Sequence, residues 1–242
     1  MTRATTILAL TAVCAAAGAG TAAAQTGGAN SVGYLTLNIG AQPQRRTIAA
    51  SSTFRIYDET ATVEASQRIR NGAMFDVGVG MYFTEHLAAG LAYTMFGRPG
   101  TGVVTASIPN PSVFNQARRQ EKDADDLKHK EQWLHLRLSY VTPVSDSMEV
   151  AVSVGPSFVR LQQGVATTVT VPANSQDFTV DKAEEEEQTF GLNAGVDANY
   201  LVTTNVGVGI FVHYLYGKLD LPSAPGFTVG GVQGGVGLRV RF

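Results

Sequence analysis

The strongest constraint on the fold is an alternation of apolar and polar residues that recurs in eight segments of the chain. Successive side chains of a β-strand point to opposite faces, so a period of two indicates strands with one apolar face. The segments are residues 33–44, 73–83, 87–97, 131–142, 148–162, 188–202, 205–217 and 228–242. Each supplies the roughly 9 to 11 residues that a tilted strand needs to cross the hydrocarbon of a bilayer.

The connections between these segments are alternately short and long. Three tight reversals, each with an aromatic residue and a threonine before a few turn residues, occupy residues 82–90, 140–152 and 200–209. Long polar stretches are predicted to be loops, at residues 45–71, 98–130 and 164–187 and, more briefly, at 218–226. Short periplasmic turns and long extracellular loops are typical of a transmembrane barrel. This layout predicts an all-β chain that forms an eight-stranded antiparallel up-and-down transmembrane β-barrel.

The apolar face of the eight segments carries no charged residue. A Lys or Arg at the midplane of a lipid-facing surface costs about 2–4 kcal/mol, so this absence is what lipid requires. The opposite face is small or polar nearly throughout, and its glycines suit a narrow lumen better than a solvated surface. The apolar face is therefore predicted to face lipid. A soluble barrel with an apolar interior is the alternative.

Aromatic residues mark both edges of this apolar face. One predicted girdle lies at the turn-side ends of the second, fourth, sixth and eighth segments and consists of Phe83, Tyr140, Tyr200 and Phe242. The other is assigned to Tyr93, Phe158 and Tyr214 or Tyr216.

The first residues of the chain indicate a secretory signal peptide. Arg3 precedes an Ala- and Leu-rich run that ends in three alanines before Gln25, an A-x-A cleavage site. Residues 1–24 are predicted to be removed, and residues 25–242 to form one barrel domain. Cys14 lies in the removed part, so no thiol chemistry is expected. The net charge of −2 lacks the basic excess that would indicate nucleic acid as a partner.

With these features the sequence resembles the small outer-membrane β-barrel proteins of Gram-negative bacteria, the OmpA-like, OmpX-like and opacity-type group. The resemblance spans nearly the whole mature chain and rests on the repeated turns, the alternation and the final VGLRVRF. It implies an outer-membrane location and contact with the lipid bilayer and lipopolysaccharide; we also expect a monomer. Leu238, Val240 and Phe242 look like the C-terminal signal that the family presents to the barrel-assembly machinery. Since nothing follows Phe242 in this sequence, the peptidoglycan-binding domain of full-length OmpA-like proteins is expected to be missing.

The polar face carries charges that are predicted to form an ion-pair network in the lumen. They are Asp76, Arg137, Glu149, Asp197 and Arg239. Buried charges persist only when paired, and the interior of an eight-stranded barrel is just wide enough to be filled by side chains. A plugged lumen is the prediction, and a narrow or gated pore is the alternative. His213 has Asp197 or Ser139 as candidate neighbours across strands, and a serine in place of Gly209 is expected to be tolerated.

No arrangement of residues indicates catalysis, a metal or a cofactor. His135 and Ser139 are four residues apart on one strand, about 13 Å, beyond the hydrogen-bond reach of a nucleophile and its base. His86, in a turn, and His129, in a loop, make no metal-ligand spacing with another His or Cys. The chain is predicted not to be an enzyme and to bind no cofactor.

Three polar segments outside the strands carry further predictions. The mixed charges of residues 117–132 indicate a short surface helix. The acidic run 181–188 is interpreted as a solvated loop, with binding of divalent cations that bridge lipopolysaccharide as the alternative. Residues 53–69 predict a protruding hairpin whose edge can capture a partner strand. The predicted role is therefore structural or one of surface interaction, and a narrow pore and a loop-mediated adhesin are the alternatives.

Overall fold

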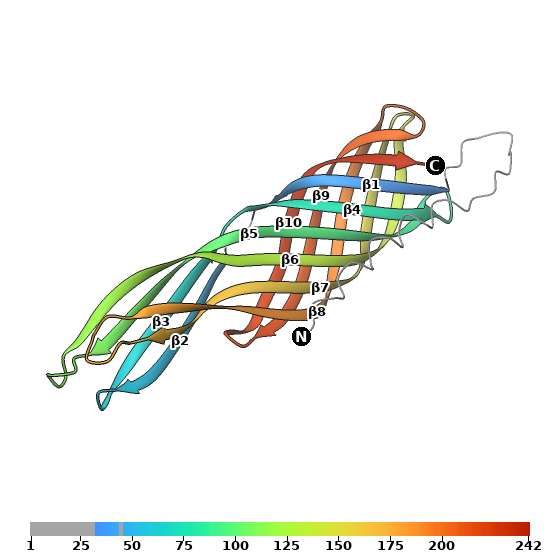
Figure 1. Ribbon diagram of the computed structural model, residues 1–242. Coiled ribbons are helices and arrows are strands. Elements are labelled where there is room, and N and C mark those ends of the chain that lie inside the picture. Colours follow the sequence, from blue (N-terminus) through green and yellow to red (C-terminus); the bar gives the residue numbers. More distant parts are fainter. Residues whose placement is uncertain (1–31, 44–45) are drawn as a thin grey trace, which may run out of the picture. The chain divides into compact units, whose positions relative to one another are not determined.

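The computed structural model describes residues 32–43 and 46–242, and the expected signal peptide lies outside these residues. Within them the chain forms ten antiparallel strands (Figure 1). They are β1 (Gly33–Gln42), β2 (Arg46–Ile56), β3 (Glu59–Ile69), β4 (Gly72–Tyr82), β5 (Leu87–Pro109), β6 (Ala117–Ser145), β7 (Met148–Thr170), β8 (Thr179–Leu201), β9 (Val206–Leu221) and β10 (Ala224–Arg241). No helix in the described part of the chain is long and apolar enough to cross a membrane.

Eight of the strands in the described residues close into a barrel. Round the ring the order is β1, β4, β5, β6, β7, β8, β9 and β10, and β10 pairs again with β1. Leu37 of β1, for example, lies opposite Leu238 of β10 and Val77 of β4. The predicted eight-stranded up-and-down barrel is thus confirmed. β2 and β3 form an additional hairpin, which joins the sheet where β3 pairs with β5.

The outer surface of the barrel is apolar, and the central part of its interior holds small and polar residues. Ile210, Val154 and Leu138 are 64%, 57% and 54% exposed, whereas Asn38 and His135 of the opposite face are buried. The facing predicted from the alternation is therefore confirmed. A continuous exposed belt of large apolar side chains is the surface that a transmembrane barrel presents to lipid.

Aromatic side chains lie at both borders of this belt. Those at the turn end are Phe83, Tyr140, Tyr200 and Phe242, with 68%, 53%, 53% and 62% of each residue exposed. At the other border the rings of Phe158 and Phe190 meet edge to face at 5.6 Å, and Tyr214 and Tyr216 are exposed. Phe190 was not among the expected members of the second girdle. Their anchoring role at the membrane surface stays a prediction.

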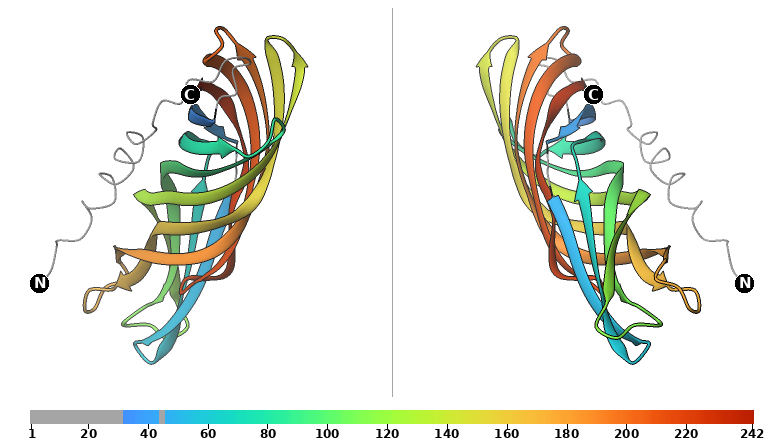
Figure 2. Two further views of the ribbon diagram at one scale, coloured as in Figure 1. Left: turned by 90° about the vertical axis from the view of Figure 1, so that its right-hand side faces the viewer. Right: turned by 90° about the vertical axis from the view of Figure 1, so that its left-hand side faces the viewer.

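Most of the stretches predicted to be loops are strands. β5 and β6 stay paired from Leu87 and Tyr140 as far as Pro109 and Ala117, and β7 and β8 continue in the same way. Residues 98–130 and 164–187 therefore extend the sheet beyond the barrel, and β9 and β10 shorten 218–226 to a tight turn. We call residues 46–69, 98–128 and 164–187 the extension (Figures 1 and 2).

The helix predicted over residues 117–132 is wrong, because this segment belongs to β6. Its exposed charged residues are interspersed with Ala124, Leu127 and His129, which are buried, and the pairing register with β5 shifts between Ala124 and Leu127. His129, predicted in a loop, is therefore a buried strand residue. The period of two is present in this segment, but the high charge content conceals it.

The extension has a small apolar core of its own, which explains why these polar sequences form strands. The core comprises Val63, Val104, Ala106, Ile108, Ala124, Leu127 and Phe178, from β3, β5, β6 and the β7–β8 connection. The β2–β3 hairpin confirms the prediction for residues 53–69, although it is longer than expected. Its turn is Tyr57 and Asp58, both at positive φ (53° and 60°), as a two-residue hairpin turn of this kind requires.

Polar contacts tie the tips of the three hairpins together. Lys122 of β6 pairs with Asp177 at 2.9 Å, and its ammonium hydrogen bond holds the pKa of this carboxyl below its usual value. The Tyr57 hydroxyl, in the β2–β3 turn, donates to the backbone oxygen of Ser175 at 3.0 Å. The three hairpins are therefore joined to one another at their ends and do not project independently.

The acidic run 181–188, interpreted as a solvated loop, is part of strand β8. Two of its carboxylates have basic partners, since Glu184 lies 3.1 Å from Lys128 and Glu186 lies 2.6 Å from Arg160. Divalent-cation binding in this run stays an alternative.

Candidate functional site

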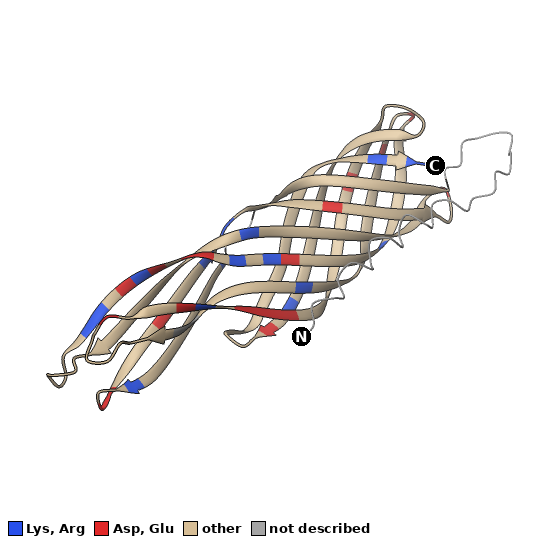
Figure 3. Cartoon of the chain, in the orientation of Figure 1, with Lys and Arg blue, Asp and Glu red and all other residues tan. Residues whose placement is uncertain are grey.

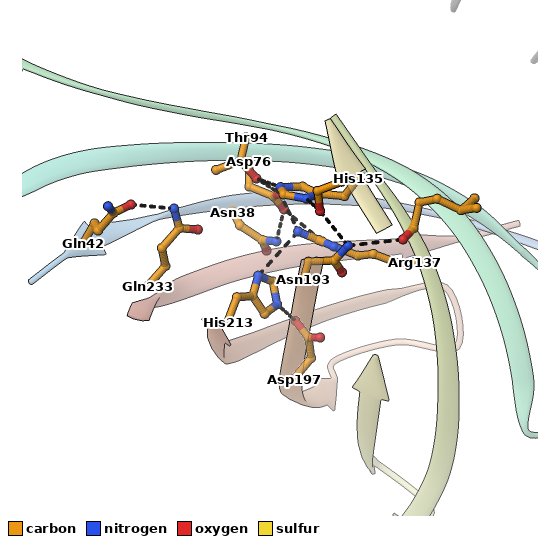
Figure 4. Close-up of polar contacts among 12 residues, drawn as sticks. Asn38, Gln42, Asp76, Thr94, His135, Arg137, Asn193, Asp197, His213 and Gln233 are labelled. Atoms are coloured by element: carbon orange, nitrogen blue, oxygen red, sulfur yellow. Dashed lines mark hydrogen bonds and ion pairs between the residues drawn. The ribbon is translucent and has the colours of Figure 1, made fainter. Parts of the chain in front are cut away.

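The centre of the barrel lumen holds a network of polar side chains around Asp76 (Figure 4). This fully buried carboxylate accepts hydrogen bonds from Asn38 Nδ2 and Thr94 Oγ1, each at 2.7 Å, and from Arg137 Nη2 at 2.9 Å. Asn38 and Thr94 are the residues directly opposite Asp76 on β1 and β5. Strand register alone therefore places two neutral donors beside the carboxylate, and Arg137 reaches it from β6.

Two histidines extend this network across the lumen. His213 Nε2 lies 3.2 Å from Asp197 Oδ1, and His213 Nδ1 lies 3.5 Å from Arg137 Nη2. His135 Nε2 lies 3.0 Å from Thr94 Oγ1. Of the two neighbours considered for His213 from the sequence, the structure places Asp197 in contact. The network thus joins side chains from β1, β4, β5, β6, β8 and β9.

A second charged group lies in the lumen at the turn end. Glu149 accepts a hydrogen bond from Arg239 Nη1 at 2.9 Å and also contacts Arg241 Nη2. Arg239 lies over the ring of Tyr34, 4.9 Å from its centroid. A cavity of about 20 Å³ beside Tyr34 and Arg239 has room for about one water molecule.

The five charged residues singled out from the sequence thus form two groups. Arg137 pairs with Asp76 and Arg239 pairs with Glu149, while Asp197 contacts His213 and forms no ion pair with a described arginine. Sequence reasoning missed the neutral members Asn38, Thr94 and Ser157, because a neutral side chain gives no pairing signal.

The outer part of the lumen is filled by apolar side chains, so the expectation of a small or polar lumen face is wrong there. The members of this lumen layer are Trp133, Val159, Leu161, Leu215, Leu219, Leu221 and Val229. Trp133 is fully buried and stacks on His135, with ring centroids 5.9 Å apart. A signal was present, since Trp133 shares the parity of His135 and Arg137 and so belongs to the lumen face.

Polar side chains lie among these apolar residues in the outer lumen. Glu131 is fully buried and accepts hydrogen bonds from Trp133 Nε1 at 3.0 Å and from the backbone N–H of Gly230 at 3.1 Å. His129 Nε2 lies 3.1 Å from the same carboxylate. Gln233 Nε2 donates to Gln42 Oε1 at 2.8 Å in this region. Polar and apolar side chains are therefore packed against one another in the outer lumen, where Leu161 lies directly opposite Glu131.

The one close serine–histidine contact in the central network is not the pair considered from the sequence. His135 Nδ1 lies 2.7 Å from Ser157 Oγ, which is directly opposite on β7, whereas Ser139 is not its partner. Both residues are buried, and Trp133 covers the imidazole ring. This geometry orders the lumen but leaves no open approach for a substrate carbonyl. Among the described residues, no group of three His, Cys, Asp or Glu side chains could hold a metal ion.

The expectation that Gly209 tolerates a serine is contradicted. A Cβ at this position would lie 2.6 Å from the backbone oxygen of Ala198 and would also collide with Asn199 Oδ1. The backbone of the neighbouring strand cannot move away cheaply. Glycine in this lumen is therefore required by close strand packing and not only by the narrowness of the interior.

The three residues assigned to an assembly signal lie on β10 and at its end. Leu238 and Val240 lie opposite Val208 and Val206 of β9, on the outer face. Phe242 exchanges two backbone hydrogen bonds with Gly33, at 2.8 and 3.0 Å, and its ring covers that glycine. They therefore line the seam where the last strand meets the first.

No protein-family model and no curated protein matches this chain. Among solved structures, the Neisserial surface protein A is 13% identical, with 87% of this chain and 97% of that chain covered and a TM-score of 0.49. OprG from Pseudomonas aeruginosa is 13% identical (88% and 97% covered, TM-score 0.48), and the protease OmpT from Escherichia coli is 10% identical (86% and 97% covered, TM-score 0.43). All three are Gram-negative outer-membrane β-barrel proteins.

Proposed function

We propose that this chain, an integral outer-membrane β-barrel protein, is a non-conducting and non-catalytic anchor that holds a rigid extension at the cell surface. The observation that carries the proposal is the filling of the lumen by packed side chains. The Asp76 network, the apolar side chains around Trp133 and the hydrogen-bonded Glu131 together occupy it.

The packed lumen opposes passage of solutes because each group of side chains would have to be displaced. An ion that crosses the Trp133 layer meets seven buried apolar side chains among the described residues, without polar groups to replace its hydration shell. Passage through the Asp76 layer would require the Arg137 pair to separate inside a low-dielectric interior. A narrow pore, the first alternative, therefore requires rearrangement of both layers.

Single-channel recording tests the proposal directly. We expect the refolded full chain in planar bilayers to show no resolved conductance steps in 1 M KCl, while a 16-stranded porin prepared in the same way conducts. Stable openings of the wild-type chain would reject the non-conducting anchor and favour the pore.

The second candidate role, an adhesin, is favoured by the order of the extension. Its hairpins share an apolar core. The Lys122–Asp177 ion pair joins the β5–β6 and β7–β8 hairpins, and the Tyr57–Ser175 hydrogen bond joins the β2–β3 hairpin to them. The outer strand β2 pairs with β3 on one side, and it presents Ser51 to Ile56 at the end of the sheet order. A rigid edge of this kind supports capture of an extended partner segment by strand addition. Loss of cell or matrix adhesion on shortening the β2–β3 hairpin, with barrel stability retained, would support it.

We also propose that Leu238, Val240 and Phe242 are read by the barrel-assembly machinery. Phe242→Ala is then expected to reduce the folded barrel in outer membranes severalfold, measured by heat-modifiable mobility. Its loss of apolar burial costs at most about 1–3 kcal/mol in refolded protein. The matched control is Tyr200→Ala, which removes a similarly exposed aromatic of the same border from another strand. Equal losses for the two variants in cells would remove the assembly role.

A further inference from the structure

The rim of the barrel where β5 and β6 pass into the extension, beside the end of β3, carries a cluster of basic side chains. Its members are Arg68, Arg70, Arg98, Lys128 and Lys130, and we call them the basic rim. They line two adjoining grooves that share Arg98. Figure 3 shows basic segments side by side on β5 and β6 just where the barrel passes into the extension.

Most of the charge on the basic rim is not neutralised by the protein. Among the described residues, only Lys128 of the five forms an ion pair, with Glu184 at 3.1 Å. Arg98 donates to the backbone oxygen of Asn71, which leaves its charge uncompensated. Asp126 lines the groove that contains Lys128 and Lys130, and the described lining of the other groove has no acidic residue. Four unpaired cations thus face one stretch of surface.

The groove that continues toward the barrel is amphipathic. Besides Arg98, Lys128 and Lys130 it is lined by Phe75 and Met95, which are 41% and 38% exposed and belong to the lipid-facing belt. Cations therefore lie immediately above apolar side chains, at the level where lipid headgroups meet acyl chains. The long hairpins are on the same side, which places this level in the outer leaflet.

We propose that the basic rim binds the phosphate groups of a lipopolysaccharide molecule, with an acyl chain of its lipid A against Phe75 and Met95. Charge complementarity supports this occupant, since a diphosphorylated headgroup offers two anions to the four unpaired cations. The asymmetry of the rim supports a discrete site over a general attraction to lipid. On the β7–β8 side, Arg160 is neutralised by Glu186 at 2.6 Å.

Binding of lipid A to the full chain in detergent micelles, measured by calorimetry, tests the proposal. Removing two cations from an anionic lipid site weakens binding about tenfold to thirtyfold, so we expect this loss for Arg98→Gln/Lys130→Gln. Arg55→Gln/Arg118→Gln removes the same charge from exposed hairpin tips and should change affinity less than about twofold. Heat-modifiable mobility verifies that each variant is folded, and Arg68→Gln/Arg70→Gln provides a second rim variant.

Two further binding measurements identify the ligand. Dephosphorylated lipid A should bind the wild type and the Arg98→Gln/Lys130→Gln variant equally, because the cations then have no anion to contact. Inorganic phosphate at millimolar concentration should fail to displace lipid A. Equal lipid A affinity for wild type and both rim variants would overturn the proposal. So would an equal loss in the tip variant, which indicates bulk charge, or displacement by inorganic phosphate, which indicates a free-anion site.

Discussion

Replacing Trp133 by alanine is expected to lower the free energy of unfolding of the refolded barrel by about 3–5 kcal/mol, the usual range for a fully buried Trp. The indole is buried in the lumen, stacks on His135 and donates to Glu131. Its removal leaves a cavity and a buried carboxylate without one of its donors. Urea unfolding of the refolded protein, followed by heat-modifiable mobility, measures the change.

The same variant should also conduct if the apolar layer blocks the lumen. We expect Trp133→Ala to show current steps in planar bilayers that the wild type lacks. Trp133→Phe is the matched control, because it keeps an aromatic ring in the layer and loses only the hydrogen bond to Glu131, at a cost of about 1–3 kcal/mol. If the Trp133→Ala barrel were as stable as wild type and also showed no current steps, the indole ring would not be what fills the lumen.

The position of Trp133 depends on two glycines on strands opposite to it. Gly191 of β8 pairs with Gly217 of β9, and a Cβ on either would lie 3.1 or 3.2 Å from the indole ring. A large side chain on β6 is thus accommodated by the absence of side chains across the lumen. Barrel interiors commonly alternate small and large residues in this way. The glycine content of the sequence is therefore partly explained by this one tryptophan.

The barrel itself could be predicted because its signal is local. Alternation within each strand decides which residues face lipid, and Ile210 and Leu138 are exposed as their parity requires. Turn length distinguishes the two ends of the barrel, and the reversals at 82–90, 140–152 and 200–209 are turns between barrel strands. Neither inference needs to know which residue lies opposite which.

The extension could not be predicted from composition because its core is assembled from distant segments. Phe178, between β7 and β8, contacts a cluster that includes Val104 of β5 and Leu127 of β6. Each segment alone carries few apolar residues, and its charges resemble those of a solvated loop. Long-range pairing of β5 with β6 supplies the missing partners. Sequence reasoning correctly identified only the β2–β3 hairpin, whose pairing is local.

Predicting the contacts in the lumen requires the strand register, which the sequence alone does not reveal. His135 lies opposite Ser157 and Asp76 lies opposite Thr94, and these pairings are decided by the exact residue at which each turn reverses the chain. A shift of two residues would keep every lipid-facing side chain outside and yet exchange all partners in the lumen. The charges in the lumen could therefore be identified, but their individual partners could not.

Arg137→Ala is expected to destabilise the barrel by about 3–5 kcal/mol, because it leaves the Asp76 carboxylate buried without a counter-charge. Asp76 is fully buried and the Arg137 side chain is 12% exposed, so solvent can replace the guanidinium only in part. Asn38 and Thr94 would still donate to the carboxylate, but neither neutralises it. The urea midpoint of the refolded barrel measures the loss. Arg160→Ala, which breaks an exposed pair with Glu186, is the matched control and should cost less than about 1 kcal/mol.

A double-mutant cycle separates the buried charge from lost packing. If an unpaired carboxylate causes most of the loss, Asp76→Asn in the Arg137→Ala background should recover stability, since the amide keeps the shape and removes the charge. The double variant should then be more stable than Arg137→Ala alone by at least about 1 kcal/mol. Additive losses from the two changes would mean that Arg137 acts through packing against its neighbours. The ion pair would then contribute no coupling energy, and the charges at the centre of the lumen would not stabilise the folded barrel.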